Sequence, residues 1–355
     1  MAKQKRNHYI PEFLINNFAS RSERAKKWVW QFRRGVDPKE LSTRDVAVAK
    51  YFYGGSQTGL EGQLGKLETR IAPVILAVIG GDPPSLHSED LARFIYFMCA
   101  RPRSLRIASA DAATEMLTSF VSEKHEPRIR EILESKLEPE YEQRVDDYLK
   151  GLPKRQRKAA AKKLRKKKGQ TMEQLRQGLY NMDLGEMLAI FRSSVSAEKF
   201  RAAAEKGQLQ GLSRLFEEGP PIDSLKNATW RILRRSTNGF ILGDCGAFAV
   251  DEEGRPGSLF RFGKDGWREI YLPIGVESVL VAQRKSHPIF LNPEQVNRCS
   301  ATLSELAFFA SENAIAFCEL AAVIGDDALL LDEDETEQMS SDIWDELADE
   351  ARPTE

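Results

Sequence analysis

The sequence predicts an α+β protein in which residues 1–225 are mostly helical and a smaller C-terminal part contains antiparallel strands packed on the same core. Two observations predict this division. Apolar residues recur every three or four positions through most of the first part, which is the period of an amphipathic helix. Between residues 226 and 291, short apolar runs alternate with Gly, Asp and Pro, as in strands joined by turns. The length suits one domain over residues 1–325.

The helical pattern is clearest over residues 59–79, and it stops at the Gly-Gly-Asp-Pro-Pro of 80–84. An apolar stripe follows from Ser88 onward, and Pro102 should kink or end that helix because proline cannot donate a backbone hydrogen bond. Further helices are expected over 106–123, 126–150, 184–206 and 293–313. The expected strands are Trp230–Leu233, Gly239–Leu242, Phe248–Val250, Arg268–Leu272 and Ser278–Gln283.

Several protein classes are excluded by what the sequence lacks. It has no apolar signal peptide and no stretch long enough to span a membrane, which favours a cytoplasmic protein with no membrane partner. The four cysteines are scattered, without the paired spacing of a structural zinc site. The motifs of P-loop NTPases, dinucleotide enzymes, zinc proteases and α/β-hydrolases are also absent.

The net charge of −1 hides two oppositely charged segments. Residues 153–169 form a basic insertion that is expected to project, because it has almost no apolar face. Its ten cations are Lys154, Arg155, Arg157, Lys158, Lys162, Lys163, Arg165, Lys166, Lys167 and Lys168. Residues 326–355 carry thirteen acids and one arginine, and a flexible tail with a short docking segment around Trp344 is expected there. The basic run could bind a nucleic-acid backbone, or pair with the acidic tail.

At several separate points, in the same order, the chain resembles a bacterial family called domain of unknown function 4238. The matching segments are Asn7–Leu14 (NHYIPEFL), Val46–Tyr53 (VAVAKYFY), Phe97–Arg103 (FMCARPR), Phe240–Asp244 (FILGD), Tyr271–Ile274 (YLPI) and Leu291–Asn292. Asp244-Cys245-Gly246 replaces the Asp-Asn-Pro of the family, and the Thr of its Arg-Thr-Pro is missing before Pro102. The resemblance implies a place among bacterial defence or mobile-element genes, including anti-phage systems, and it supplies no catalytic mechanism.

Five residues are candidates for a catalytic cluster: His8, Glu61, Glu68, Arg101 and Asp244. Glu61 and Glu68 are seven positions apart, so they share one face of a helix. Arg101 lies on the core-facing stripe of the next helix and needs an acidic partner if it is buried, so we expect it to contact one of these glutamates. His8 can transfer protons near neutral pH. We expect it to lie close to the same cluster.

Each of these residues also has a structural interpretation. The glutamates and Arg101 can form an ion pair between packed helices, and His8 can bond a backbone carbonyl. Asp244 sits in a Gly-rich turn, where aspartate often bonds its own backbone. Cys245 would be a nucleophile only with a base beside it.

The leading functional hypothesis is a defence effector that acts on nucleic acid, as an RNA-directed nuclease. In this hypothesis His8 or a glutamate moves the proton and Arg101 or Arg103 stabilises the charge of the phosphorane. Mg²⁺ or Mn²⁺ at Glu61, Glu68 and Asp244 is compatible with these residue types, but their spacing does not indicate it. The alternative is a non-catalytic sensor or toxin that binds a phage or host macromolecule. The oligomeric state is left open.

Overall fold

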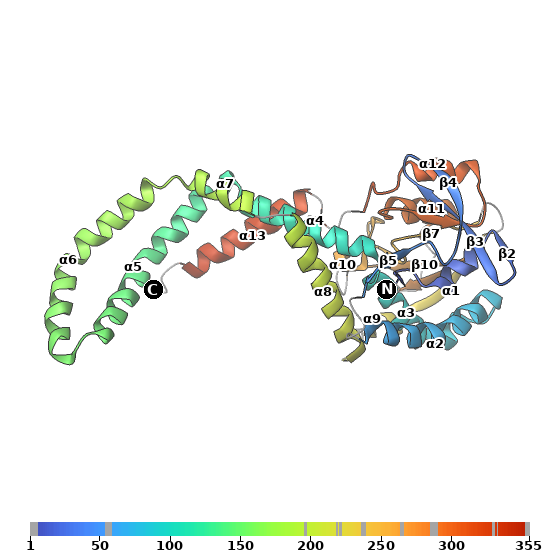
Figure 1. Ribbon diagram of the computed structural model, residues 1–355, viewed down its shortest axis with the longest axis horizontal. Coiled ribbons are helices and arrows are strands. Elements are labelled where there is room, and N and C mark those ends of the chain that lie inside the picture. Colours follow the sequence, from blue (N-terminus) through green and yellow to red (C-terminus); the bar gives the residue numbers. More distant parts are fainter. Residues whose placement is uncertain are drawn as a thin grey trace, which may run out of the picture. The chain divides into compact units, whose positions relative to one another are not determined.

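The computed structural model describes residues 6–53, 59–194, 197–217, 219, 222–235, 239–262, 266–284, 290–328, 331 and 333–351 (Figure 1). The chain forms two compact units. The core unit comprises Met1–Asp111 and Phe200–Leu331, and the arm unit comprises Ala112–Lys199 and Asp332–Glu355. The expected α+β class is confirmed, because long helices occupy most of the first two thirds and antiparallel sheets involve the C-terminal part. The single domain over residues 1–325 stays a prediction.

One five-stranded antiparallel sheet of the core unit has the order β6-β11-β10-β8-β9. Its two central strands, β10 (Glu269–Gly275) and β11 (Ser278–Gln283), are buried at every position, so both of their faces are covered. The other strands are β6 (Thr229–Arg234), β8 (Phe248–Val250) and β9 (Pro256–Gly257). Short continuous apolar runs bounded by turn residues are typical of such buried strands. The strands expected around positions 230, 248, 270 and 280 are therefore confirmed.

A second sheet pairs strands from the beginning of the core unit's sequence with strands from its C-terminal part. It has the order β2-β3-β12-β7, with β4 also paired to β3. Its strands are β2 (Arg21–Glu23), β3 (Lys26–Arg33), β4 (Val36–Ser42), β7 (Leu242–Gly243) and β12 (Phe308–Ala310). Phe32 of β3 lies opposite Phe308 of β12 and stacks on it at 4.9 Å between ring centroids. A small third sheet pairs β1 (Arg6–His8) with β5 (Val48–Lys50).

The strands before residue 50 are missing from the sequence-based prediction, which described the N-terminal part only as helical. Their local signal is present in the aromatic and β-branched run Trp28–Phe32. The run ends at Gly35, whose φ of 68° makes the turn into β4. The pairing of β3 with β12 joins residues far apart in the sequence. Local periodicity carries no information about such a pairing.

Helices of the core unit pack against these sheets from different sides (Figure 1). They are α1 (Glu12–Ile15), α2 (Leu60–Gly80), α3 (Ser88–Ala100), the start of α4 (Arg103–Phe120), α8 (Ala197–Glu217), α9 (Asp223–Lys226), α10 (Leu259–Phe262), α11 (Pro293–Thr302) and α12 (Ile315–Ala321). The predicted break at Pro102 is confirmed, because α3 ends at Ala100 and α4 begins at Arg103. The apolar face of α2, including Leu64, Ile71 and Ile75, is buried.

The closing helix is shorter than the predicted 293–313. Helix α11 begins with a capping box in which the side chains of Asn292 and Gln295 each accept the other's backbone N–H. It ends at Thr302, and the chain then forms β12. The reason is the carboxylate of Asp244, which accepts the backbone N–H groups of Glu305, Leu306 and Ala307. These groups are therefore turned away from the preceding carbonyls that a continuing helix would need.

The arm unit contains a long antiparallel helical hairpin made by α5 (Glu126–Gly151) and α6 (Lys154–Tyr180), with α7 (Leu184–Ser194) after it (Figure 1). The basic run forms the first half of α6 and continues through Gly169 without a break. Lys168 pairs with Glu138 and Glu142 of α5, each at 2.5 Å. These ion pairs hold the two helices together where α6 faces α5.

The acidic segment also belongs to this unit, and it differs from the flexible tail expected with a short docking segment. Residues Glu333–Ala351 form helix α13. Trp344 is only 8% exposed, stacks on Phe120 at 4.1 Å and donates a hydrogen bond of 2.9 Å to its carbonyl. The apolar anchor was visible in the sequence, but the length of the helix around it was not.

No helix among the described residues is both long and apolar enough to cross a membrane.

Replacing Trp344 with alanine should release α13 from the arm unit. The buried indole loses its contacts with Phe120, and such truncations cost about 3–5 kcal/mol. Proteolysis and amide hydrogen exchange should show faster opening of residues 333–351. The control is Leu347→Ala, because Leu347 is 37% exposed. Equal protection of α13 in wild type and Trp344→Ala would contradict this anchor.

Candidate functional site

The guanidinium of Arg101 lies at the C-terminal end of α3 and is the most buried cation among the predicted site residues, with a side chain 5% exposed. Its Nη1 donates to Glu68 Oε1 at 2.6 Å, and its Nε donates to the hydroxyl of Tyr53 at 2.5 Å. Its Nη2 donates to the backbone carbonyl of His8 at 2.6 Å. Tyr53 donates to the same carbonyl at 2.8 Å. We call this group of four residues the Arg101 node.

The node confirms that Arg101 contacts one of the two glutamates. The partner is Glu68, while Glu61 lies two turns earlier on α2. The node also confirms that His8 lies close to the cluster, although its main chain makes the contact. A buried guanidinium must be paired and hydrogen-bonded, because removing its hydration otherwise costs several kcal/mol. The node therefore explains why these segments are held at the end of α3.

The imidazole of His8 was predicted to transfer protons, but in the structure it contacts a backbone carbonyl. Its Nε2 lies 3.3 Å from the backbone carbonyl of Thr43. A carbonyl only accepts hydrogen bonds, so this contact requires a proton on Nε2. Burial lowers the pKa of His8 below its ordinary value. The ring is therefore neutral near pH 7 and bonded to the backbone, as in the structural interpretation.

Asp244, the remaining predicted residue, lies directly after β7 and is 1% exposed. Its carboxylate accepts the N–H groups of Glu305, Leu306 and Ala307 at 2.8, 2.9 and 3.1 Å. Burial raises its pKa to about 6, and the three hydrogen bonds work in the opposite direction. The carboxylate is thus mostly ionised at neutral pH. It places a buried negative charge beside the segment that carries Glu305.

Glu305 is a titratable residue that the sequence reasoning missed. It is half-buried, and its Oε2 is buried without a hydrogen-bond partner among the described residues. Burial raises the pKa of Glu305 to about 7, and the neighbouring charge of Asp244 adds to the rise. Arg103, Asp111 and Arg201 act on it as well. No sequence motif marks Glu305, because its environment comes from Asp244, about sixty positions earlier.

Tyr9 is the second missed residue, although it stands next to His8 in the NHYIPEFL segment. The residue is 5% exposed, and its hydroxyl is not among the buried atoms that lack a hydrogen-bond partner. Burial raises the pKa of Tyr9 above its ordinary value, and Asp244, Arg103 and Glu305 all act on it electrostatically. The charges of Arg103, Asp244 and Glu305 therefore all act on Tyr9. We call Tyr9, Arg103, Asp244 and Glu305 the carboxylate cluster.

The loop after Asp244 packs closely against the α3–α4 junction, next to the residue that precedes Arg103. Gly246 has a φ of 72°, and a Cβ atom there would lie 2.9 Å from the backbone oxygen of Met98 and 3.4 Å from Pro102. Only glycine fits this approach without a shift of the backbone. Arg103, the first residue of α4, follows Pro102 directly.

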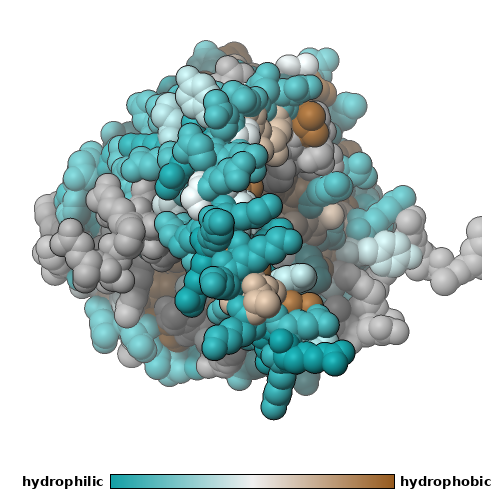
Figure 2. All heavy atoms as spheres, turned by 90° about the vertical axis from the view of Figure 1, so that its left-hand side faces the viewer, coloured by the Kyte–Doolittle hydropathy of each residue, from teal (hydrophilic) through white to brown (hydrophobic). Residues whose placement is uncertain are grey.

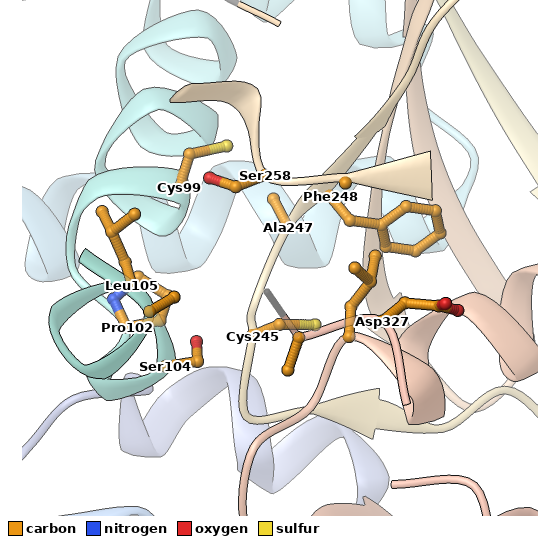
Figure 3. A pocket seen from close by; sticks show the side chains of 13 residues that line it. Cys99, Pro102, Ser104, Leu105, Cys245, Ala247, Phe248, Ser258 and Asp327 are labelled. Carbon is orange, nitrogen blue, oxygen red and sulfur yellow. The ribbon is translucent and has the colours of Figure 1, made fainter. Parts of the chain in front are cut away.

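The same junction borders a cavity of about 40 Å³, with room for about one water molecule. Figure 3 shows Cys99 of α3 and Cys245 of the loop after β7 among the side chains that line it. Burial raises the pKa of Cys99 to about 12 and that of Cys245 above its ordinary range. Both thiols stay protonated near neutral pH, which is unfavourable for a nucleophile.

No group of three His, Cys, Asp or Glu side chains within the described residues is arranged to hold a metal ion.

The protein has an α+β fold. Four of its segments meet at the junction between α3 and α4, namely β1, α2, α3 and the loop after β7. The chain matches the family described as "Protein of unknown function (DUF4238)" over residues 6–341. It belongs to this family. Comparisons with curated proteins and with solved structures give no match.

Arg101→Met should destabilise the core unit by about 3 kcal/mol, at the lower end of the range for breaking a buried ion pair. The reason is that Glu68, with 27% of its side chain exposed, can regain some hydration. Urea unfolding monitored by tryptophan fluorescence measures the change. Arg70→Met is the control, since Arg70 pairs with Asp90 at the surface. Similar losses for the two variants would contradict the special position of Arg101.

Glu305 should contribute stability that is present below about pH 4.5 and is lost as the pH rises to about 7. The folded-state pKa of Glu305 lies above its ordinary value of 4.5, so the folded chain binds this proton more tightly than the unfolded chain. Glu305→Gln should flatten this dependence in part, with Asp244 supplying the remainder. The free energy of unfolding across this pH range, with Glu312→Gln as control, measures it. Identical slopes for the two variants would show that Glu305 titrates normally.

Proposed function

We propose that the protein acts on nucleic acid, and that the first half of α6 binds the phosphate backbone. The observation that carries the proposal is the exposure of nine cations between Lys154 and Lys167 on one rigid helix. Figure 2 faces the α5–α6 hairpin and shows mainly hydrophilic side chains there. Phosphate contacts are made by just such lysines and arginines, and release of counterions drives the binding.

Most of the positive charges in the first half of α6 are not neutralised by neighbouring acids. Lys168 pairs with two glutamates of α5, and Arg157 donates to the backbone carbonyls of Lys150 and Leu152. The other eight cations of the run form no ion pair with any acid in the described part of the chain. Lys158, Lys162 and Lys166 are spaced by four, so they lie along one side of the helix over about 12 Å.

The acidic helix α13 leaves this surface uncovered. Its ion pairs join Glu337 to Lys124 and Asp345 to Arg128, near the start of α5. These contacts favour separate roles for the acidic segment and the basic run over pairing between them. A rise in affinity when residues 332–355 are deleted would still support pairing.

The reaction that we propose is the cleavage of RNA in bacterial defence. The family resemblance is what supports a defence role, and the unusual ionisation of Glu305 and Asp244 supports acid–base chemistry. A second candidate is a non-catalytic sensor or toxin that binds a phage or host macromolecule. The burial of Arg101 favours this alternative for the Arg101 node, because a guanidinium 5% exposed does not reach a substrate.

The first test compares two triple variants that change the net charge equally. Lys158, Lys162 and Lys166 are replaced by glutamine in one, and Lys136, Arg144 and Lys150 of α5 in the other. Binding to single-stranded and duplex RNA is titrated at several salt concentrations, with and without Mg²⁺ or Mn²⁺. Each lost phosphate contact lowers the slope of log K against log salt by about 0.7–0.9, so the α6 variant should lose about 2 units.

The α5 variant should retain the wild-type slope of log K against log salt and most of the affinity. The reason is that the replaced cations of α5 are surrounded by acidic residues of the same helix, which repel phosphate. Equal losses in both variants would show that only net charge matters. Undetectable binding by wild type at low salt would remove the nucleic-acid role from α6.

A further inference from the structure

We infer that a cavity between α2, α3 and α8 of the core unit binds a nucleoside monophosphate. The cavity has a volume of about 280 Å³. This volume lies just under the range of about 300–1,000 Å³ that is usual for ligand sites, so it suits a small ligand. The inference does not depend on the basic run of α6, and it goes beyond the proposed function.

The charge of the cavity lining is the first observation. Among the described residues that line the cavity are three cations, Lys66, Arg70 and Arg93, and no acid. Two other cavities, of about 230 and 270 Å³, are each lined by two arginines together with two glutamates. The excess of positive charge is therefore a property of this cavity and is not general among cavities of its size.

The helical period brings these side chains to one place. Gln63, Lys66 and Arg70 are spaced by three and four, so they share one face of α2. Arg70 forms an ion pair of 3.1 Å with Asp90, which joins this face of α2 to the first turn of α3. Arg93 follows Asp90 by about one turn of α3. Both helices therefore contribute cations to the same cavity.

The acids near the cavity leave part of this positive charge unpaired. Arg93 donates from Nη2 to Glu89 Oε1 at 3.0 Å, and Glu89 also pairs with Lys226 of α9 at 3.6 Å. Lys66 forms no ion pair with an acid in the part of the chain that the structure describes. A guanidinium has five N–H donors, so Arg70 and Arg93 can bond an anion in addition to their acids.

The lining also has an apolar, aromatic part. Phe97 of α3 stacks on Phe216 of α8 with ring centroids 4.5 Å apart, and Leu67 and Leu215 line the cavity with them. Inorganic phosphate or a sugar phosphate would leave this apolar part in contact with water. A nucleotide has an anionic group for the cations and a flat base for the aromatic and apolar surface. The amide of Gln63 can donate to and accept from the polar edge of a base or ribose.

The test is isothermal titration calorimetry of the full chain with 5′-AMP at low salt, with adenosine and inorganic phosphate as control ligands. AMP should bind more tightly than either control by about tenfold, because each control lacks one of the two groups that the cavity recognises. Raising the salt concentration should weaken the binding of AMP and leave that of adenosine unchanged.

Two variants separate the two parts of the cavity. Lys66→Gln should weaken the binding of AMP about tenfold, as expected for the loss of a charge-assisted hydrogen bond. Lys66 is exposed and has no ion pair to lose, so this variant should unfold at the wild-type temperature. Phe216→Leu should weaken the binding of AMP about fivefold and leave that of phosphate unchanged. Arg298→Gln is the control, because it changes the net charge equally at a cavity that also contains glutamates.

A nucleoside monophosphate can be free or can be the 5′ end of an RNA strand. Competition of AMP with a trinucleotide that carries a 5′-phosphate, or a 5′-hydroxyl in its place, distinguishes these sources. Displacement of AMP by the phosphorylated trinucleotide alone would support the site and assign it to a strand end. No displacement by either trinucleotide would support the site and assign it to a free nucleotide.

Four results overturn the inference: no binding of AMP at millimolar concentration, equal affinities of Lys66→Gln and Arg298→Gln for AMP, or binding of adenosine or of phosphate as tight as that of AMP. The triple variant of α6 should bind AMP with the wild-type affinity. Failure of this site therefore leaves the proposed function standing, and loss of RNA binding by α6 leaves this site standing.

Discussion

A single buried guanidinium organises the junction at the end of α3 in the core unit. Arg101 joins the first strand, the segment before α2 and α2 itself to the end of α3. Because an unpaired charge in this position would cost several kcal/mol, the three segments are stable only when all are in place. The node thereby fixes two neighbours that it does not contact, Tyr9 beyond His8 and Arg103 beyond Pro102.

The two units differ in where their charged side chains lie and in how these are paired. The core unit buries a few charged groups and gives them hydrogen-bond or ion-pair partners, as at Arg101 and Asp244. The arm unit pairs its acids with cations locally, at Lys168 on α6 and at Lys124 and Arg128 near the start of α5. What remains is an excess of exposed positive charge on the first half of α6. The net charge of the whole chain, −1, gives no sign of this excess.

Much of the fold could be predicted from local pattern. The pattern of apolar residues located α2 and the buried pair β10 and β11, and Pro102 itself marked the break after α3. Helical geometry also predicted that Arg101 contacts Glu61 or Glu68. The parts that were missed depend on long-range contacts. Asp244 ends α11 by accepting hydrogen bonds from the N–H groups of residues 305–307, and β3 pairs with β12. Glu305 becomes unusual only through these contacts, so its sequence neighbourhood carries no signal. Tyr9 could have been noticed, because it stands between His8 and Pro11 in the family-like segment.

The central claim, that the first half of α6 binds nucleic acid, is tested most directly by lysine acetylation footprinting with and without RNA. Lys158, Lys162 and Lys166 should be protected by RNA at low salt and lose that protection at high salt. Lys136 and Lys150 of α5 belong to the same hairpin and should react equally in both conditions. Unchanged acetylation of α6 in the presence of RNA, or equal protection of the α5 lysines, would contradict the account.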